Sequence, residues 1–312
     1  MSTTTSPTSP TFETAGRIVV GVDGSSQSAV ATEWAARRAE ALDVGLTLVL
    51  ALPPLQVPSP GSLSQMLRQD ARDFTTRVAR SAQERLDRAT SEARAQHPDL
   101  DISSALLEDS EPALALVQAS KDAEMVVAGT RGLGAVRAMA LGSVSRHLVS
   151  HAHGPVAVVP ETGTAHDDRS AGTVLVGVED AERSHALPVA IREAARMGGR
   201  LLVVHSWEYT PGTVEGLPVM DPDLFSRVQE TFSTQLEEQV RAQLDQAPEL
   251  DVEVRVGLGH AGEVLVNASH EAELLVVGSR ARSGLAGAVL GSTAAHVVRQ
   301  SICPVIVVPT RR

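Results

Sequence analysis

Short runs of apolar residues alternate along this chain with segments that have helical periodicity. The first run, 17–22, is rich in β-branched residues, and Val30, Trp34 and Ala35 behind it share one helix face. Uninterrupted apolar runs are typical of strands buried on both faces of a parallel sheet. Further strands are expected at 46–52, 102–107, 125–128 and 155–159, with helices at 63–95, from 111 and from 142. This alternation predicts an α/β fold.

The second half of the chain repeats the first. Strands are expected there at 174–178, 201–204, 252–256, 274–277 and 304–308, and helices near 221–246 and 262–271. The segment from Gly129-Thr130-Arg131 to Leu141-Gly142-Ser143 recurs 149 residues later, whereas the opening strands lie 156 residues apart. An insertion or deletion is therefore expected in the middle of one copy. We predict two α/β domains, 15–161 and 173–310, joined by a polar linker at 162–172 and preceded by a disordered Ser/Thr/Pro-rich tail at 1–14.

Composition limits the partners of these domains. The 312 residues carry a net charge of −11 and only 2% aromatics. Polymeric nucleic acid is an unexpected partner, because such a surface neither neutralises phosphates nor stacks bases. Lys121 is the only lysine, so any function that needs a phosphate-loop lysine must depend on that residue or on arginine. Cys303 is the only cysteine, so an intrachain disulfide is excluded. No apolar run approaches the roughly 20 residues of a membrane span, and we expect a cytoplasmic protein with no membrane partner.

Two loops carry candidate binding residues. After the fourth strand, Gly129 and Gly132 are followed nine residues later by Gly142 and Ser143, which open a helix. Glycines let backbone amides approach a ligand closely, and a helix N-terminus attracts anions. After the first strand, Asp23 places a carboxylate at a neighbouring strand end. Ligands of open parallel sheets bind at such strand ends, so the sequence predicts an anion site there.

Structural explanations of the same residues remain open. Gly129 and Gly132 could occupy a turn that needs positive φ, and Asp23 could cap the helix ahead of Ser26. Ser143 and its repeat Ser292 could cap their helices in the same way. A cap on either helix is compatible with a bound ligand.

Other polar residues favour structural roles. His147 and its repeat His296 are expected to pack, and Cys303 is expected to be a buried apolar side chain. His151 and His153 resemble a chelating pair, but the sequence places no carboxylate or thiol beside them.

Three motifs together resemble one known family. They are the Gly-x2-Gly-x9-Gly-Ser spacing, the opening Val-Gly-Val-Asp-Gly-Ser and the closing His-Ala-x-Gly-Pro-Val-Ala-Val-Val-Pro. The three motifs occur in this order in the first half and again in the second. Together they resemble the universal stress protein family in its tandem-domain form, and the resemblance covers the chain from Arg17 to Pro309. The resemblance implies two Rossmann-like open parallel five-stranded sheets, of the adenine nucleotide alpha hydrolase-like kind, with strand order 3-2-1-4-5 and helices on both faces. It also implies an internal pseudo-dimer through the last strands and further homodimerisation.

The resemblance further implies a stress-response protein that binds an adenine nucleotide, ATP with or without Mg²⁺, as a regulatory or structural ligand. Asp23 and Val22 would meet the adenosine and Leu52 would line the base pocket. Ser145 would add a hydroxyl to the terminal phosphate. The full set of binding residues carried over from the motifs is Val22, Asp23, Leu52, Gly129, Arg131, Gly132, Gly142, Ser143, Val144, Ser145, Gly278, Arg280, Gly291, Ser292 and Thr293.

The second half departs from this pattern. Ala281 replaces the second glycine of its motif, and Glu179 stands at the position of Asp23. An added methyl group crowds a phosphate, and Glu reaches one methylene further, so weaker binding is expected there than in the first half.

No catalytic motif accompanies the loops. The chain has no phosphate-loop lysine motif, nucleophile elbow or His-Glu-x2-His pair, so we expect no efficient catalysis. Two alternatives stay open. One is a slow ATPase or autophosphorylating enzyme, and the other is an interaction module whose pocket is degenerate or holds a cyclic nucleotide.

Overall fold

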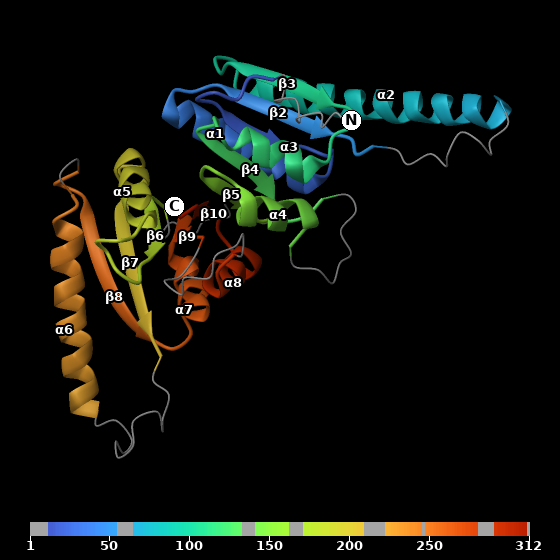
Figure 1. Ribbon diagram of the computed structural model, residues 1–312. Helices are drawn as coiled ribbons and strands as arrows, with labels where there is room; N and C mark the ends of the chain where they lie inside the picture. The colour runs from blue at the N-terminus through green and yellow to red at the C-terminus, as the bar shows by residue number, and fades with distance from the viewer. Residues whose placement is uncertain are drawn as a thin grey trace, which may run out of the picture. The chain divides into compact units, whose positions relative to one another are not determined.

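A computed structural model describes residues 12–54, 65–132, 141–161, 171–208, 222–244, 247–279 and 290–310. Its internal contacts divide the chain into two compact units, Met1–Glu161 (unit 1) and Thr162–Arg312 (unit 2). The boundary falls at the start of the linker expected from the sequence. Each unit is described by itself below, with the element labels of Figure 1.

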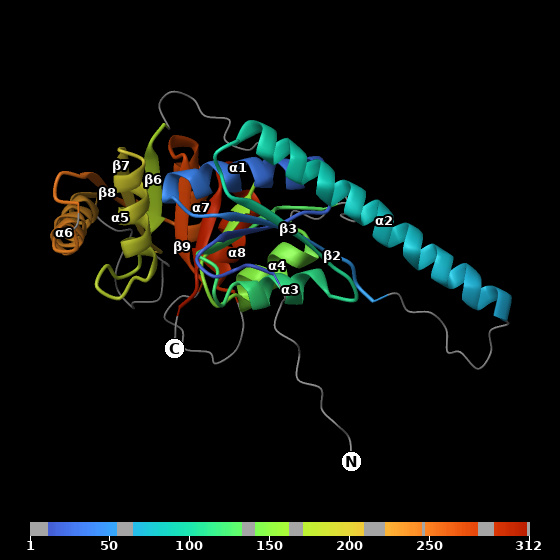
Figure 2. The same ribbon diagram turned by 90° about the horizontal axis from the view of Figure 1, so that it is seen from above.

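Unit 1 is an open parallel sheet. Its described elements are β1 (Ile18–Gly21), α1 (Ser26–Leu42), β2 (Leu46–Ala51), α2 (Gln65–Gln96), β3 (Ile102–Leu107), α3 (Pro112–Ala119), β4 (Met125–Gly129), α4 (Ser143–His151) and β5 (Val156–Val159). The parallel pairings give the strand order β3-β2-β1-β4-β5. Helices α1 and α2 pack together over one face, and α3 and α4 pack together over the other (Figure 2).

Unit 2 repeats this topology. Its described elements are β6 (Thr173–Gly177), α5 (Ala186–Arg196), β7 (Arg200–Trp207), α6 (Pro222–Arg241), β8 (Asp251–Leu258), α7 (Ala261–Ala268), the 3₁₀ turn η1 (Ser269–Glu271), β9 (Leu274–Gly278), α8 (Ser292–Gln300) and β10 (Val305–Val308). The parallel pairings give the order β8-β7-β6-β9-β10. The α/β class and both parallel sheets expected from the sequence are therefore confirmed.

The central strands form the core of each unit because both of their faces are covered. Ile18, Val19 and Val20 of β1 are fully buried, as are Leu175 and Val176 of β6. Burial of apolar surface stabilises the folded state by about 25 cal/mol per Å². The apolar runs in the sequence thus mark the strands that hold each sheet together.

One glycine in each unit fixes how a helix meets the sheet. A Cβ at Gly21 would lie 2.8 Å from a methyl carbon of Leu116, and a Cβ at Gly177 would lie 2.7 Å from a methyl carbon of Leu265. Both distances are too short for a real contact, so these glycines let α3 and α7 approach the first strand closely. The same packing in both units supports an origin by duplication.

Three boundaries differ from the sequence-based expectations. The expected disordered tail extended to residue 14, but the carbonyl oxygen of Glu13 accepts a hydrogen bond from Thr47, and Thr14 is buried. Gly172, expected in the linker, belongs to unit 2, where its amide donates to Glu273 at 2.8 Å. The helix expected to reach residue 246 ends at Arg241. Hydrogen bonds to residues far away in the sequence, which composition does not reveal, set the first two limits.

The two copies differ in length at several places rather than one. Equivalent residues lie 156 positions apart in β1 and β6, 155 in β2 and β7, 150 in β3 and β8, and 149 in β4 and β9. Ser25 and Ser184 each accept a hydrogen bond through Oγ from the amide three residues further on, and they lie 159 apart. By this correspondence the loop after the first strand is three residues longer in unit 2. No helix among the described residues is long and apolar enough to cross a bilayer.

Candidate functional site

The order of strands reverses between β1 and β4 in unit 1 and between β6 and β9 in unit 2. The loops that leave the carboxyl ends of these strands diverge to opposite faces, which opens a crevice between them. The predicted binding residues lie on these loops. Both units therefore place the candidate residues where the fold itself provides room for a ligand.

In unit 1, the loop after β1 is shaped by Asp23. Its Oδ1 accepts a hydrogen bond from the amide of Ser25 at 2.9 Å, and Gly24 between them has φ +86°. Ser25 in turn caps α1, because its Oγ accepts from the amide of Ser28 at 3.1 Å. Ser25 is therefore the N-cap, and Asp23 forms the preceding turn, so the explanation of Asp23 as the cap is wrong.

Close approach, and not backbone conformation, explains the glycines after β4. Among the described residues, neither Gly129 nor Gly132 has positive φ, so the turn explanation is wrong. A Cβ at Gly129 would lie 3.3 Å from the carbonyl oxygen of Gln27, and one at Gly132 would collide with Oδ2 of Asp23. The structure therefore brings Asp23 and the glycine loop together, as a shared site requires.

Helix α4 begins beside this loop. Gly142 is its N-cap residue, has no side-chain cap, and donates its own amide to the carbonyl oxygen of Thr130 at 2.7 Å. Ser143 is the first helical residue and is exposed, so the expectation that it caps the helix is wrong. The first amides of α4 have no acceptor within the helix, and they give it a positive end suited to an anion.

The Ser145 hydroxyl is turned inward. It is buried and donates to the carbonyl oxygen of Gly129 at 2.6 Å. This differs from the expectation that Ser145 donates to a terminal phosphate, because its only hydroxyl proton already has an acceptor. Ser145 joins α4 to the end of β4 and thereby positions the glycine loop.

Arg131 and Leu52 lie at the margins of this region. The guanidinium of Arg131 is 4.0 Å from the Glu161 carboxylate, which also accepts a hydrogen bond from Gln27 at 3.2 Å. The backbone amide and carbonyl of Leu52 bond Leu107 and Ser110 across β3, and its side chain is half-buried. Val22 is buried at the end of β1, and Val144 is half-buried in the first turn of α4.

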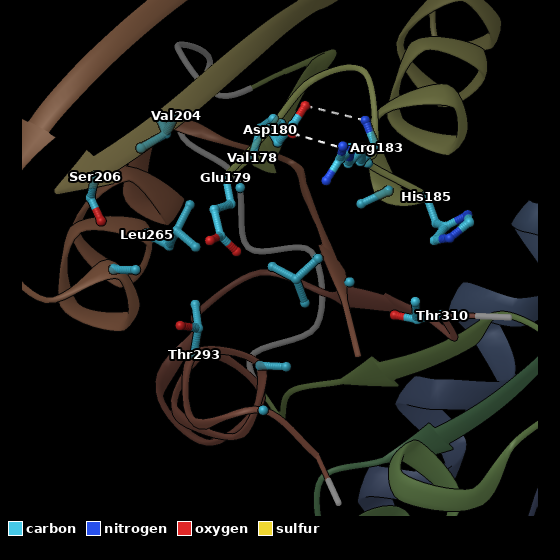
Figure 3. Close-up of a pocket in the computed structure, with 18 of the residues that line it drawn as sticks. Val178, Glu179, Asp180, Arg183, His185, Val204, Ser206, Leu265, Thr293 and Thr310 are labelled. Atoms are coloured by element: carbon cyan, nitrogen blue, oxygen red, sulfur yellow. Dashed lines mark hydrogen bonds and ion pairs between the residues drawn. The ribbon is translucent and has the colours of Figure 1, made fainter. Parts of the chain in front are cut away.

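Unit 2 has a cavity of about 470 Å³ at the equivalent place. The end of β6, the ends of β7 and β9, and the first turns of α7 and α8 surround it (Figure 3). Of the predicted residues, Gly278, Gly291 and Thr293 line it, whereas Ser292 is exposed on α8. Arg280 and Ala281 lie outside the described residues. Cavities of about 300–1,000 Å³ hold small molecules and cofactors.

The N-terminus of α8 faces this cavity. Gly291 is its N-cap and bonds the carbonyl oxygen of Ser279 at 2.8 Å, as Gly142 bonds Thr130 in unit 1. No side-chain cap is present, and Ser292 is the first helical residue, so the expected Ser292 cap is also wrong. The helix start is thus left available to a ligand.

Alternate residues at the end of β7 form one wall of the cavity. Val204, Ser206 and Glu208 line it, and the intervening Trp207 does not appear among the lining residues. Trp207 is the counterpart of Leu52 by strand register, since β2 and β7 are offset by 155 residues. From this correspondence we expect Ala51 and Pro53, rather than the Leu52 side chain, to face the equivalent space in unit 1. The two-residue period of a strand could have revealed this from the sequence.

The remaining candidates have structural roles. Burial raises the pKa of the Cys303 thiol to about 11, as expected for a buried apolar cysteine. His147 stacks on His151 with ring centroids 4.1 Å apart, and burial first and the neighbouring ring second lower its pKa. Among the described residues, no group of three or more His, Cys, Asp or Glu side chains could hold a metal ion.

Known proteins resemble this chain along nearly its full length. The sequence profile of the universal stress protein family matches residues 14–160 and again 171–309. A universal stress protein of Mycolicibacterium smegmatis is 33% identical over 296 residues, 94% of this chain and 97% of that protein. One from Mycobacterium tuberculosis is 34% identical over 298 residues, 93% of this chain and 96% of that protein.

A solved universal stress protein from Archaeoglobus fulgidus has the same fold. It covers 94% of this chain and 98% of its own, with a TM-score of 0.58 and 17% sequence identity. Two profile matches, relatives that share a third of their residues, and a repeated fold agree with one another. This chain belongs to the universal stress protein family and carries two copies of its domain.

Proposed function

We propose that this universal stress protein binds an adenine nucleotide, ATP in particular, as a regulatory or structural ligand in the stress response. The observation that carries the proposal is the cavity of unit 2. It lies where the strand order reverses, and its lining includes Gly278 and Gly291 of the motif and Thr293 directly after it. A sequence motif and a cavity of suitable size thus coincide.

The chemistry of the cavity suits such a ligand. Val204 and Leu265 provide an apolar wall for a base, and the uncapped N-terminus of α8 provides amide donors for a phosphate. Since the described residues offer no protein cage for a metal, Mg²⁺ that accompanies ATP would be held mainly by the phosphates and water.

A ligand role is favoured over efficient catalysis by the position of the charges. Lys121 is the only lysine, and it follows α3 and precedes β4, at the end of the strand opposite the crevice. No lysine can therefore neutralise the charge that develops on a transferred phosphate, and because the sequence also has no catalytic motif we expect phosphoryl transfer to be slow. Release of phosphate from labelled ATP measures this directly, and a rate typical of ATPases would contradict the ligand role.

Equivalent substitutions in the two units test binding. Thr293→Asp and Val144→Asp place a negative charge in the first turn of α8 and of α4. An acidic residue there stabilises the helix, so each variant should fold, yet it repels a phosphate at the helix end. By isothermal titration we expect each variant to bind ATP at least about tenfold more weakly at its own site, through lost charge-assisted hydrogen bonds and repulsion.

Thr234→Asp is the matched control, because Thr234 is exposed on α6 outside the crevice. It adds the same charge and should leave both affinities unchanged. Failure of the unmodified protein to bind ATP, or equal affinity in all variants, would overturn the proposal. Mass spectrometry of ligand released from the purified protein identifies the adenine nucleotide and separates ATP from a cyclic nucleotide.

A further inference from the structure

Glu179 enters the cavity of unit 2 with an uncommitted carboxylate. It follows Val178 at the end of β6, and its side chain extends into the space between Leu265 and Thr293 (Figure 3). No hydrogen bond or ion pair joins it to another described residue. A carboxylate in this position has its full capacity to accept hydrogen bonds from a ligand.

The longer loop of unit 2 explains why Glu179 is available. In unit 1, Asp23 builds the turn after β1 and lies against Gly132. In unit 2, Asp180 builds the turn, because its Oδ1 accepts from the amides of Glu182 at 3.1 Å and Arg183 at 3.3 Å. In unit 2 the turn is therefore formed by Asp180, and the preceding residue Glu179 is left to face the cavity.

Glu179 lies between the two ends of the cavity. Val204 and Leu265 form the apolar end, and the first turn of α8 with Gly291 and Thr293 forms the end suited to a phosphate. A nucleotide with its base on the apolar wall and its 5′-phosphate at α8 has its ribose beside Glu179. This placement rests on the proposed adenine nucleotide function.

We propose that Glu179 is a specificity-determining residue, which selects nucleotides with a free ribose 2′,3′-diol and rejects those phosphorylated at the 3′ position, including 3′,5′-cyclic nucleotides. Two hydroxyl donors satisfy the carboxylate oxygens, as an acidic residue does for the ribose of dinucleotides. A phosphate esterified to the 3′ oxygen removes one donor and brings a like charge close to the carboxylate. Unit 2 thus selects 5′-nucleotides over cyclic ones.

The test compares 5′-AMP with 3′,5′-cyclic AMP, which carry the same base and one phosphate each. Isothermal titration uses the full chain in the Val144→Asp background, so that unit 2 provides the binding site, with excess EDTA to remove divalent cations. We expect 5′-AMP to bind roughly tenfold or more tightly than cyclic AMP, because the loss of a hydrogen bond to a charged group usually weakens binding by about this factor. Glu179→Gln should reduce that preference several-fold, chiefly by strengthening the binding of cyclic AMP.

Glu208→Gln is the matched control, since Glu208 lines the same cavity from the end of β7 and the substitution removes the same charge. Glu208→Gln should preserve the preference for 5′-AMP over cyclic AMP. That result would show that the effect of Glu179→Gln is not a general effect of the charge in the cavity. A preference unchanged in Glu179→Gln, or equal effects of both substitutions, would overturn the inference while nucleotide binding stands. Binding of neither nucleotide nor ATP would instead overturn the proposed function.

3′-Deoxyadenosine 5′-monophosphate separates the hydrogen bond from the repulsion. It lacks one hydroxyl but carries no phosphate at that carbon. We expect it to bind unit 2 several-fold more weakly than 5′-AMP, with the difference reduced in Glu179→Gln. Equal affinity for both compounds would contradict recognition of the diol.

Discussion

The Ser145 hydroxyl connects the start of α4 to the end of β4. Its 2.6 Å bond to the carbonyl oxygen of Gly129 is buried, so water cannot replace the donor once it is lost. Unit 2 has Ala294 at the equivalent position, also buried. Helix α8 therefore begins without this hydrogen bond, although Gly291 bonds Ser279 in unit 2 as Gly142 bonds Thr130 in unit 1.

Replacement of this hydroxyl should destabilise unit 1. Ser145→Ala leaves the Gly129 carbonyl oxygen without this donor, and we expect a loss of about 1–3 kcal/mol in the free energy of unfolding. Chemical denaturation measures the change. Ser150→Ala is the control on the same helix, because Ser150 donates to Arg146 in a partly solvent-accessible position. An equal effect of the two substitutions would rule out a special role for Ser145.

Some residue roles could be predicted from the sequence and others could not. The Ser25 cap and the burial of Cys303 follow from local pattern and residue type. The inward hydroxyl of Ser145 depends on a carbonyl oxygen at the end of β4, and the free carboxylate of Glu179 depends on the turn that Asp180 forms beside it. A motif identifies the residues near a ligand, but only the packed fold decides which of their polar atoms are already used.

Long helices hold the first loop of each unit from the side. In α2, Arg85 donates to the carbonyl oxygen of Asp23 at 2.8 Å, and in unit 2 Gln243, just beyond α6, donates to that of Ala181 at 2.7 Å. His97 follows α2 and fixes its far end to α1, since its ring nitrogens lie 3.0 Å from Glu33 and 2.9 Å from Glu40. The position of α2 thus affects the site loop directly.

The link between α1 and α2 depends on pH. Burial by itself lowers the pKa of His97, but hydrogen bonds and attraction from Glu33 and Glu40 outweigh it and raise that pKa above 6.5. Burial raises the pKa of Glu33, but His97 and Arg37 outweigh it and lower that pKa below 4.5. The His97 contribution is complete below pH 6.5 and is lost as pH rises through its raised pKa, whereas the Glu33 contribution is lost as pH falls below 4.5.

His97→Gln should therefore destabilise unit 1 most between pH 4.5 and 6.5. We expect a loss of about 1–2 kcal/mol there, because the histidine is buried but both carboxylates are partly exposed. The loss should shrink at alkaline pH. Denaturation at several pH values measures it, with His153→Gln as a control at an exposed histidine. A difference from the unmodified protein that does not vary with pH would exclude the charged link.

The elements could be predicted well because buried parallel strands form continuous apolar runs. All strands expected from the sequence are present, with bounds that shift by a few residues. The lengths of the connections could not be predicted, since the displacement between the copies changes at several surface loops. Such loops tolerate insertions because they contribute little to the core. The three-residue extension that frees Glu179 is one of these changes.

On the scale of the whole chain, each unit has its own core. Val127 in β4 and Val276 in β9 are equivalent, and both side chains are fully buried. Each unit also holds one of the two tryptophans, Trp34 in α1 and Trp207 in β7. Fluorescence of variants that retain a single tryptophan therefore reports the unfolding of each unit separately.

Because the contacts divide into two compact units, we expect them to unfold as separate cooperative domains. Val127→Ala should lower the denaturation midpoint reported by Trp34, and Val276→Ala that reported by Trp207, each through a loss of about 1–3 kcal/mol from the buried methyl groups and the resulting cavity. Each variant should leave the other midpoint unchanged. If either substitution shifts both midpoints equally, the two units unfold as one cooperative body and the expectation of separate domains is wrong.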